Sequence, residues 1–162
     1  MRRADREITS IEEKLIIISE CKVCRIGISI NDQPYVIPLN FGYDYKNNQL
    51  ILYFHSAKEG KKIDILSQNN KSCFEVDCDH KLIEGKVACD YGFAFTSVIG
   101  FGKIEFIEDR DEKVYALNML MKHQTDCDTE YEYEDKRLNA IAVYKLIVEE
   151  FTGKHKAIPP KM

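Results

Sequence analysis

The stretch from Phe93 to Ile107 is the feature that most limits how this chain can fold. Its residues alternate between two sets, one mostly aromatic or branched and the other mostly small. Successive side chains of a strand point to opposite faces, so this pattern predicts one long strand with a bulky face and a small face. Gly100 and Gly102 lie on the small face, where they allow close approach and let the strand bend. A long strand that bends in this way is what closure of a sheet into a barrel requires.

Other runs of β-branched and aromatic residues predict further strands. They cover residues 23–30, 35–45, 50–55, 72–77 and 140–151. Asn31-Asp32 and Asn47-Asn48 are turn sequences that can join the first three of these strands. Pro38 cannot donate a hydrogen bond to a ladder, so we expect it at an edge, a bulge or a ligand-facing break. Five or six long strands with few helices predict a mainly β fold, a closed sheet with flanking helices.

Three helices are expected beside the strands. Residues 10–20 repeat apolar side chains at helical spacing after a capping box, formed by Thr9 with Glu12 or by Ser10 with Glu13, and Asp109 opens a second helical pattern. Another capping box, formed by Ser56 and Glu59, predicts a helix that starts directly after the third strand. A loop or irregular strand is expected at residues 79–90, and a solvated acidic loop at residues 126–135.

Size and charge exclude several classes of protein. A chain of 162 residues fits one domain that folds without disulfides. The formal net charge of -4 and the absence of a long basic run argue against a nucleic-acid partner. The apolar run Leu15–Ile18 is too short to cross a membrane and does not resemble a signal peptide. The six cysteines are therefore expected to be thiols, which places the protein in the cytoplasm.

A strand followed by a serine cap and a helix with glycine and lysines can bind a phosphate. Free backbone N–H groups and the helix dipole attract anions to a helix start. Gly60 would let a ligand approach closely, and Lys58, Lys61 and Lys62 could neutralise a dianion. From spacing alone, a capped surface helix with solvated lysines explains these residues equally well. The segment contains neither a Walker A loop nor a Gly-x-Gly-x-x-Gly turn, so the class of phosphate stays open.

Cysteine and histidine residues raise the alternative of a zinc site, because thiolate and imidazole are suitable ligands. The candidates are Cys21, Cys24, Cys73, Cys78, His80 and Cys89. Their spacing matches no standard zinc ribbon, and buried free cysteines are common. We therefore expect no metal. His80 and His123 are expected to be a solvated turn residue and a cation at a helix C-terminus, respectively.

Three ordered motifs point to a known family: Val-Ile-Pro-Leu-Asn-Phe-Gly-Tyr at 36–43, Leu-Tyr-Phe-His-Ser-Ala-Lys-Glu-Gly-Lys-Lys at 52–62, and Ser-Val-Ile-Gly-Phe-Gly at 97–102. Together they resemble the pyridoxamine 5'-phosphate oxidase-like flavin proteins, in particular the branch of nitroimidazole-resistance reductases. The resemblance covers the chain from Arg2-Arg3 to Lys154. It implies a six-stranded split β-barrel of Greek-key type over residues 1–154, followed by a C-terminal tail at 155–162. It also implies a homodimer with flavin mononucleotide (FMN) at its interface.

The resemblance also implies roles for particular residues. The cofactor-binding set comprises Pro38, Leu39, Asn40, Phe41, His55, Ser56, Lys58, Gly60, Lys61, Lys62, Ser97, Phe151 and Thr152. Residues 38–41 would run along the isoalloxazine ring, whereas Ser56 and the lysines would hold the phosphate. The neighbourhood of residues 151–152 would come from the second subunit. Compared with pyridoxamine phosphate oxidase itself, the turn after the third strand is shorter and the arginine-rich substrate site has no match, which argues against oxidation of vitamin B6.

These residues lead to a hypothesis of an FMN-dependent oxidoreductase, either nitroreductase-like or related to pyridoxamine phosphate oxidase. The flavin would supply the electron chemistry, and a small electron-poor molecule such as a nitro compound would accept the electrons. His55 is the expected catalytic residue, because a histidine near neutral pKa can orient a ligand or donate a proton. The alternative is a non-catalytic module of the same fold that binds or senses flavin or haem.

Overall fold

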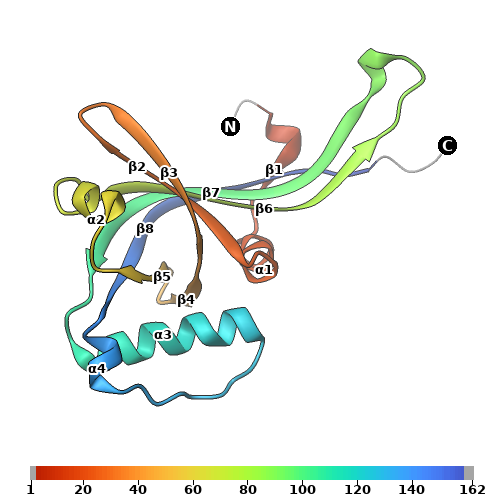
Figure 1. Cartoon of the computed structure of the whole chain (residues 1–162). Helices are drawn as coiled ribbons and strands as arrows, with labels where there is room; N and C mark the ends of the chain where they lie inside the picture. The colour runs from red at the N-terminus through yellow and green to blue at the C-terminus, as the bar shows by residue number, and fades with distance from the viewer. Residues whose placement is uncertain (1–2, 159–162) are drawn as a thin grey trace.

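The computed structural model describes residues 3–158, which form one antiparallel sheet of eight strands with helices around it (Figure 1). The strands are β1 (Glu7–Ile8), β2 (Val23–Ile30), β3 (Gln33–Asn40), β4 (Gly42–Lys46), β5 (Gln49–Ala57), β6 (Lys71–Ile83), β7 (Gly92–Phe106) and β8 (Ile141–Lys156). The helices are α1 (Ile11–Glu20), α2 (Lys61–Leu66), α3 (Arg110–Thr125) and α4 (Asp135–Leu138), with short 3-10 turns η1 (Ala4–Arg6) and η2 (Ala88–Asp90). The first residue of the Arg-Arg pair and Pro159-Pro160 of the expected tail lie outside the described residues.

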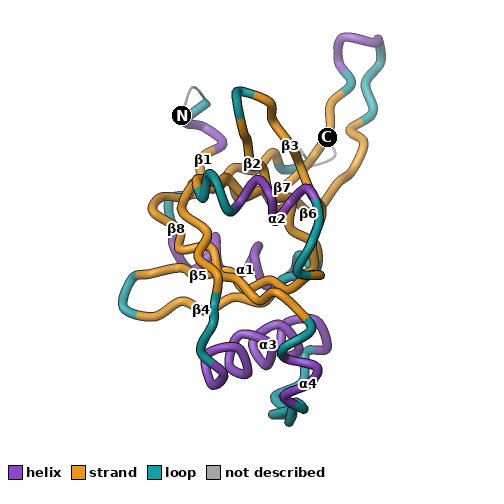
Figure 2. Tube along the Cα trace, turned by 60° about the vertical axis from the view of Figure 1, so that its left-hand side comes forward, coloured by secondary structure: helices purple, strands orange, loops and turns teal. Residues whose placement is uncertain are grey.

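The sheet closes on itself because its two edges are consecutive in the chain. The strand order is β3-β2-β6-β7-β8-β5-β4, with β1 paired to β8. Strands β3 and β4 stand at opposite ends of this order, yet Phe41 alone separates them in sequence. The edges must therefore meet, and the tube view shows the strands running around a barrel (Figure 2). The expected mainly β barrel is confirmed. Two more strands than expected arise because β1 adds a short pair and the 35–45 run divides at Phe41.

The glycines of β7 allow the neighbouring strand to approach closely. The β7–β8 register shifts between Phe101 and Gly102, which marks a bulge. A Cβ atom on Gly102 would collide with the backbone carbonyl of Ile147, and one on Gly100 would collide with the ring of Phe74. The small face of β7 therefore points into the barrel, and the bulky face points outward.

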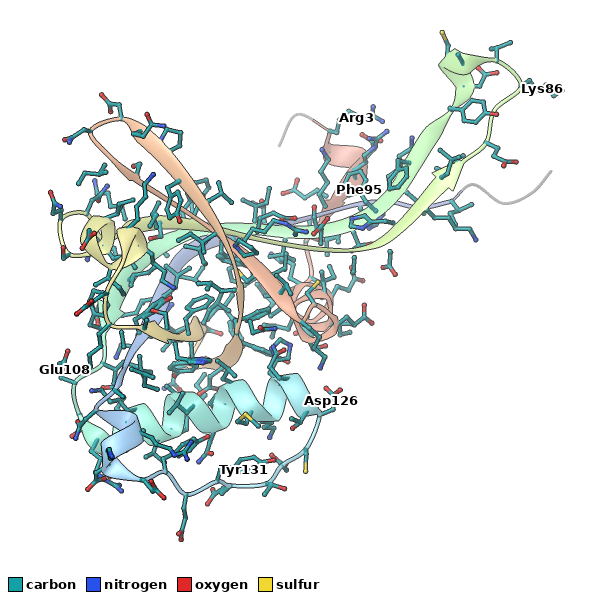
Figure 3. The ribbon with its side chains drawn as sticks, viewed as in Figure 1. Arg3, Lys86, Phe95, Glu108, Asp126 and Tyr131 are labelled. Carbon is teal, nitrogen blue, oxygen red and sulfur yellow. The ribbon has the colours of Figure 1, made fainter. Side chains whose placement is uncertain are left out.

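Two apolar clusters hold the helices against the sheet. Inside the barrel, the side chains of Phe41, Phe54, Phe74 and Tyr144 are almost fully buried, and α1 packs Ile18 against the same cluster. A second cluster lies under α3 and joins residues such as Leu117, Tyr53 and Val143. Figure 3 shows side chains filling the space between the ribbons of the body. Among the described helices, none is long and apolar enough to cross a membrane.

The strands β6 and β7 continue beyond the barrel as a hairpin arm, with Lys86 near its tip (Figures 1 and 3). Residues 79–83, expected to be a loop or irregular strand, extend β6 after a register shift between Cys78 and Lys81. The last strand, β8, likewise runs to Lys156, past the boundary expected at residue 154. Several apolar side chains of the arm are exposed, namely Leu82, Val87, Tyr91 and Phe93.

The prediction that Ser56 caps a helix is wrong. Strand β5 continues through Ala57, where Ser56 lies opposite Ala142 of β8, and helix α2 begins only at Lys61. The Ser56 hydroxyl donates a hydrogen bond to the carbonyl of Ala57 at 2.9 Å. Gly60 takes the N-cap position with φ 117°, a backbone conformation that residues other than glycine rarely adopt. Pairing with β8 therefore keeps Ser56 and Ala57 in a strand rather than at a helix start.

Candidate functional site

The sheet is split between its edge strands β3 and β4, and residues 54–57 of β5 have no ladder partner on the β4 side among the described strands. Strand β3 pairs with β2 from Gln33 to Asn40, whereas β5 pairs with β4 and β8. Among the described strands, no ladder joins β3 to β5. The predicted ring-binding residues 38–41 and the predicted pair His55 and Ser56 therefore lie on the two strands that border the split. Both segments meet near Phe41, whose ring centroid lies 6.5 Å from that of Phe54.

Helix α2 and the turn before it carry positive charge beside this split. We call Lys58, Gly60, Lys61 and Lys62 the lysine corner. The Lys61 Nζ atom lies 4.6 Å from the centre of the Tyr35 ring, so the helix reaches β3. Among residues 3–158, none of the three lysines forms an ion pair. A Cβ atom on Gly60 would meet no other atom within 4 Å, so this corner is open.

His55 and Lys62 influence each other electrostatically. Burial lowers the pKa of His55, and the positive charge of Lys62 lowers it further. Burial also lowers the pKa of Lys62. Both shifts oppose positive charge, because burial and, for His55, a like charge nearby disfavour the protonated form. The structure therefore brings His55 together with the lysine corner, as the sequence suggested.

The other predicted site residues divide between the two faces of the sheet. Pro38, Ser97 and Thr152 lie on the outer face, and Thr152 is paired with Ile99. Leu39, Phe41, Ser56 and Phe151 point inward; Leu39 and Phe151 pack against the barrel core, and the Lys14 Nζ atom lies 5.0 Å from the Phe151 ring. A ligand on one surface cannot touch the side chains of both groups.

Asn40 belongs to a second set of polar contacts, at the end of β3. Its Nδ2 atom donates to the Lys22 carbonyl at 3.1 Å and to Gln124 Oε1 at 3.0 Å. The Phe41 carbonyl accepts from Gln124 at 2.9 Å and lies 2.7 Å from Nδ1 of the buried His123. We call Lys22, Asn40, Phe41, His123 and Gln124 the closed corner. Its amide groups are engaged with the protein itself. The side-chain amide of Asn40 is thus committed to holding α3 against β3.

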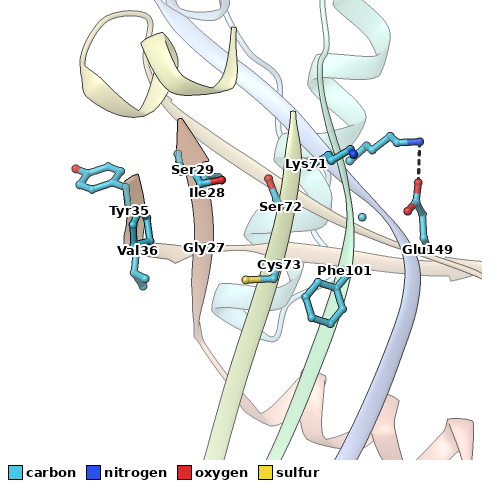
Figure 4. Close-up of a pocket in the computed structure, with 13 residues that line it drawn as sticks. Gly27, Ile28, Ser29, Tyr35, Val36, Lys71, Ser72, Cys73, Phe101 and Glu149 are labelled. Atoms are coloured by element: carbon cyan, nitrogen blue, oxygen red, sulfur yellow. Dashed lines mark ion pairs between the residues drawn. The ribbon is translucent and has the colours of Figure 1, made fainter. Parts of the chain in front are cut away.

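An apolar groove crosses the outer face of the sheet beside the lysine corner. Its volume is about 540 Å³, and Figure 4 shows its lining. Four cross-strand neighbours form its floor: Val36, Gly27, Cys73 and Phe101. Gly27 keeps the floor open, because a Cβ atom there would lie 2.6 Å from the Cys73 sulfur. Val36 and Phe101 are 62% and 51% exposed, far more than apolar side chains of a finished core.

The outer groove and the lysine corner meet at Tyr35. This residue lines the groove, while its ring packs on the barrel side of β3 and lies 4.6 Å from Lys61 Nζ. The opposite side of the groove is bounded by the ion pair of Lys103 with Glu149, 2.9 Å apart (Figure 4). An apolar groove next to a cationic segment suits a ligand with a flat apolar part and an anionic end. Sequence reasoning missed the groove, although β7 carried a signal, since both of its faces have apolar residues.

A closed antiparallel barrel with a split beside a cationic corner and an apolar outer groove defines this chain as a split-barrel protein. The chain belongs to the pyridoxamine 5'-phosphate oxidase family, whose sequence profile matches residues 10–155. The resemblance drawn from the three motifs is thereby confirmed.

Solved structures agree with this assignment. A proposed 5-nitroimidazole antibiotic resistance protein from Bacteroides thetaiotaomicron is 35% identical, with a TM-score of 0.79 over 92% of this chain and 86% of its own. The flavocytochrome Anf3 from Azotobacter vinelandii is 21% identical, with a TM-score of 0.80 over 100% and 74%. An FAD- and haem-binding protein from Mycobacterium smegmatis is 17% identical, with a TM-score of 0.79 over 97% and 77%. The last two support the fold alone. A search of curated proteins found no match.

Proposed function

We propose that this chain is an FMN-binding oxidoreductase that reduces a small electron-poor molecule, such as a nitro compound, in a site formed between two copies of the chain. The observation that carries this proposal is that the outer groove and the lysine corner adjoin at Tyr35. The relative from Bacteroides thetaiotaomicron supports the choice of a nitro compound, because 5-nitroimidazole is named as the antibiotic concerned.

The residues present fit FMN. A phosphate dianion needs cationic donors, and Lys58, Lys61 and Lys62 are free of carboxylate partners among the described residues. The flat ring system needs apolar walls, which Val36 and Phe101 offer in a groove whose volume of about 540 Å³ lies within the usual range of ligand sites. When bound, the flavin supplies the electron transfer. The chain anchors the phosphate, orients the ring and excludes water.

His55 is the proposed proton donor of the site. Its pKa is lowered by burial and by Lys62, so the free protein holds it neutral near pH 7. A phosphate beside Lys62 would offset the charge of that lysine and raise the pKa of His55 again. Binding of the cofactor would in this way prepare the imidazole to give up a proton at physiological pH.

A second copy of the chain is the proposed cover of the outer face. Ile99 is 44% exposed on the strand that also carries Phe101, and exposed apolar clusters of this kind mark interaction sites. The groove would then become a closed pocket at a homodimer interface. We further infer a cytoplasmic protein, because all six cysteines are free thiols.

Binding of FMN to the purified chain tests the cofactor assignment. We expect a yellow complex, and we expect the double variant Lys61→Glu with Lys62→Glu to bind FMN about a hundredfold more weakly, close to 2.7 kcal/mol. The double variant Lys136→Glu with Arg137→Glu on α4 changes the net charge equally but lies outside the site, so it controls for long-range charge. Equal affinity in the lysine-corner variant and the control would overturn the phosphate assignment.

Turnover tests the activity separately. The complex is reduced anaerobically with a nicotinamide cofactor and then mixed with a nitroimidazole. We expect the nitroimidazole to reoxidise the flavin well above the background rate measured without oxygen and without nitroimidazole. His55→Gln should react more slowly at unchanged FMN content. No reoxidation would favour the alternative, a module that only binds flavin or haem. Full turnover by His55→Gln would remove His55 from the mechanism.

Self-association of the chain is measured in a separate experiment. Phe101→Glu places a charge in the centre of the outer face and should weaken self-association by at least about thirtyfold, or 2 kcal/mol. Sedimentation velocity over a range of concentrations reads this out, with Lys136→Glu as control. A wild-type chain that stays monomeric with FMN bound contradicts the proposed interface.

A further inference from the structure

Two thiols and two carboxylates converge where the end of α1 meets the bulge of β6. We call Glu20, Cys21, Cys78 and Asp79 the α1–β6 cluster. The Cys78 sulfur lies 3.9 Å from Glu20 Oε2 and 3.6 Å from Asp79 Oδ2. These three ligand atoms all lie within 4.8 Å of one another. The register shift after Cys78 and the left-handed backbone of Asp79, with φ 58°, turn both side chains toward α1.

Cys21 lies beside Cys78 on the helix side, and its sulfur is not among the ligand atoms that all lie within 4.8 Å of one another. Its side chain is only 5% exposed. The pKa of Cys78 is raised to about 12, first by burial and then by the neighbouring Cys21 thiol and the Asp79 carboxylate. The other cysteines considered for zinc are elsewhere: Cys24 is buried, Cys73 lines the outer groove, and Cys89 is exposed in η2 of the arm. The fold therefore separates the Cys-x-x-Cys pair but joins two distant thiols.

The surroundings of the cluster are rich in negative charge. Burial raises the pKa of Cys21, and the carboxylates of Asp77, Glu75 and Glu20 raise it further. Arg25 contacts Glu75 and Asp77. In residues 3–158, by contrast, Glu20 and Asp79 form no ion pair. A cation at the cluster would relieve this repulsion.

We propose that Glu20, Cys21, Cys78 and Asp79 bind one zinc ion that ties α1 to β6. Zinc takes sulfur at about 2.3 Å and carboxylate oxygen at about 2.0–2.2 Å in a tetrahedron, which separates neighbouring sulfur and oxygen ligands by about 3.5 Å. The two measured sulfur–oxygen distances of 3.9 and 3.6 Å are close to this value. Thiolate ligands favour zinc over magnesium or calcium, which prefer oxygen alone.

Four protein ligands would fill the coordination sphere, which is the form of a structural rather than a catalytic zinc site. The site would fix the end of the helix against the strand at the base of the arm. It involves none of the residues assigned to FMN. Zinc binding can therefore be established or refuted whatever the outcome of the flavin experiments.

The test uses the full chain, free of any affinity tag, reduced and stripped of metal with a chelator. It is titrated with Zn²⁺ against a chromophoric competitor and with Co²⁺ alone. We expect one Zn²⁺ per chain, a cobalt spectrum with thiolate charge-transfer absorption, and a higher melting temperature with zinc. Cys78→Ser and Glu20→Gln should each weaken binding about tenfold or more, since each removes one ligand.

Control variants separate lost ligands from damaged folding. Cys127→Ser removes an exposed thiol outside the cluster, and Glu13→Gln removes an exposed carboxylate of α1; both should bind zinc as the unmodified chain does. The double variant Cys21→Ser with Cys78→Ser should keep its β-sheet circular dichroism and gain no melting temperature from zinc. Equal zinc affinity in that double variant, less than one zinc per wild-type chain at micromolar metal, or a cobalt spectrum without thiolate absorption would each overturn the site.

Discussion

The two ends of β3 meet opposite kinds of polar surroundings. Near Asn40, the closed corner pairs its amides and imidazole with the backbone carbonyls of Ser19 in α1, of Lys22 and of Phe41 at the β3–β4 junction. Near Tyr35, the lysine corner presents three ammonium groups with no carboxylate partner in the described part of the chain. The first arrangement stabilises the fold, since buried polar groups with partners hold elements in place. The second adds nothing to stability until an anion arrives, which is the property of a binding site.

Removing the imidazole of the closed corner should have the largest effect on folding. In His123, Nδ1 lies 2.7 Å from the Phe41 carbonyl oxygen and Nε2 lies 3.2 Å from that of Ser19. His123→Leu would leave both carbonyls without this partner in a buried place, so we expect the free energy of unfolding to fall by about 3 kcal/mol. Urea denaturation measures the change, and the exposed His155→Leu should alter it by less than about 0.5 kcal/mol. A loss below about 1 kcal/mol would show that these contacts do not secure the corner.

The lysine corner should behave in the opposite way. Lys62→Met keeps the apolar stem but removes a charge that burial disfavours, so the unfolding free energy without FMN should stay within about 0.5 kcal/mol of wild type. FMN affinity should fall about tenfold, or 1.4 kcal/mol, in a fluorescence titration. Lys136→Met on α4 is the matched control. A clear loss of stability with unchanged FMN affinity would reverse the contrast between the corners.

Local sequence signals predicted much of the fold. The Ser10 hydroxyl accepts from the Glu13 N–H at 3.2 Å, and the Asp109 carboxylate accepts from the Glu112 N–H at 2.9 Å, so two of the expected helix starts are capped as predicted. The third box failed at Ser56, because a ladder with β8, residues far away in sequence, held that segment as a strand. Capping motifs compete with strand pairing, and only the fold decides the outcome.

The candidate site was partly predictable. The lysines and His55 follow one another within a few residues, so their grouping is a local property. The closed corner joins residues more than eighty positions apart, as in the contact of His123 with Phe41, and no periodicity reveals such a pair. The outer groove was missed for another reason: when Phe101 and Val98 lie on opposite faces, hydrophobicity alone does not say which face stays exposed.

A double-mutant cycle measures the coupling between Asn40 and Gln124 and sharpens the contrast further. The two amides are hydrogen-bonded to each other at 3.0 Å, and both donate to the Lys22 carbonyl. We expect Asn40→Ala and Gln124→Ala to show a coupling of about 1 kcal/mol in unfolding experiments. Asn40→Ala should lower FMN affinity only if the side-chain oxygen of Asn40 also contacts the flavin ring. Strict additivity of the two variants would contradict the network.

The smallest expected effect is the pH dependence that His55 gives to stability. Burial and Lys62 lower its pKa in the folded chain, whereas the unfolded chain keeps a value near 6.5. As pH falls below about 6.5, the unfolded state therefore takes up a proton first, and the free energy of unfolding decreases until the pH passes the folded pKa. His55→Gln should flatten this slope between pH 7.5 and 5 in the absence of FMN, while His155→Gln should not. Because a bound phosphate raises the pKa of His55, saturating FMN should also flatten the slope in the wild-type chain. A slope that persists in His55→Gln would assign the effect to another group and separate His55 from the lysine corner.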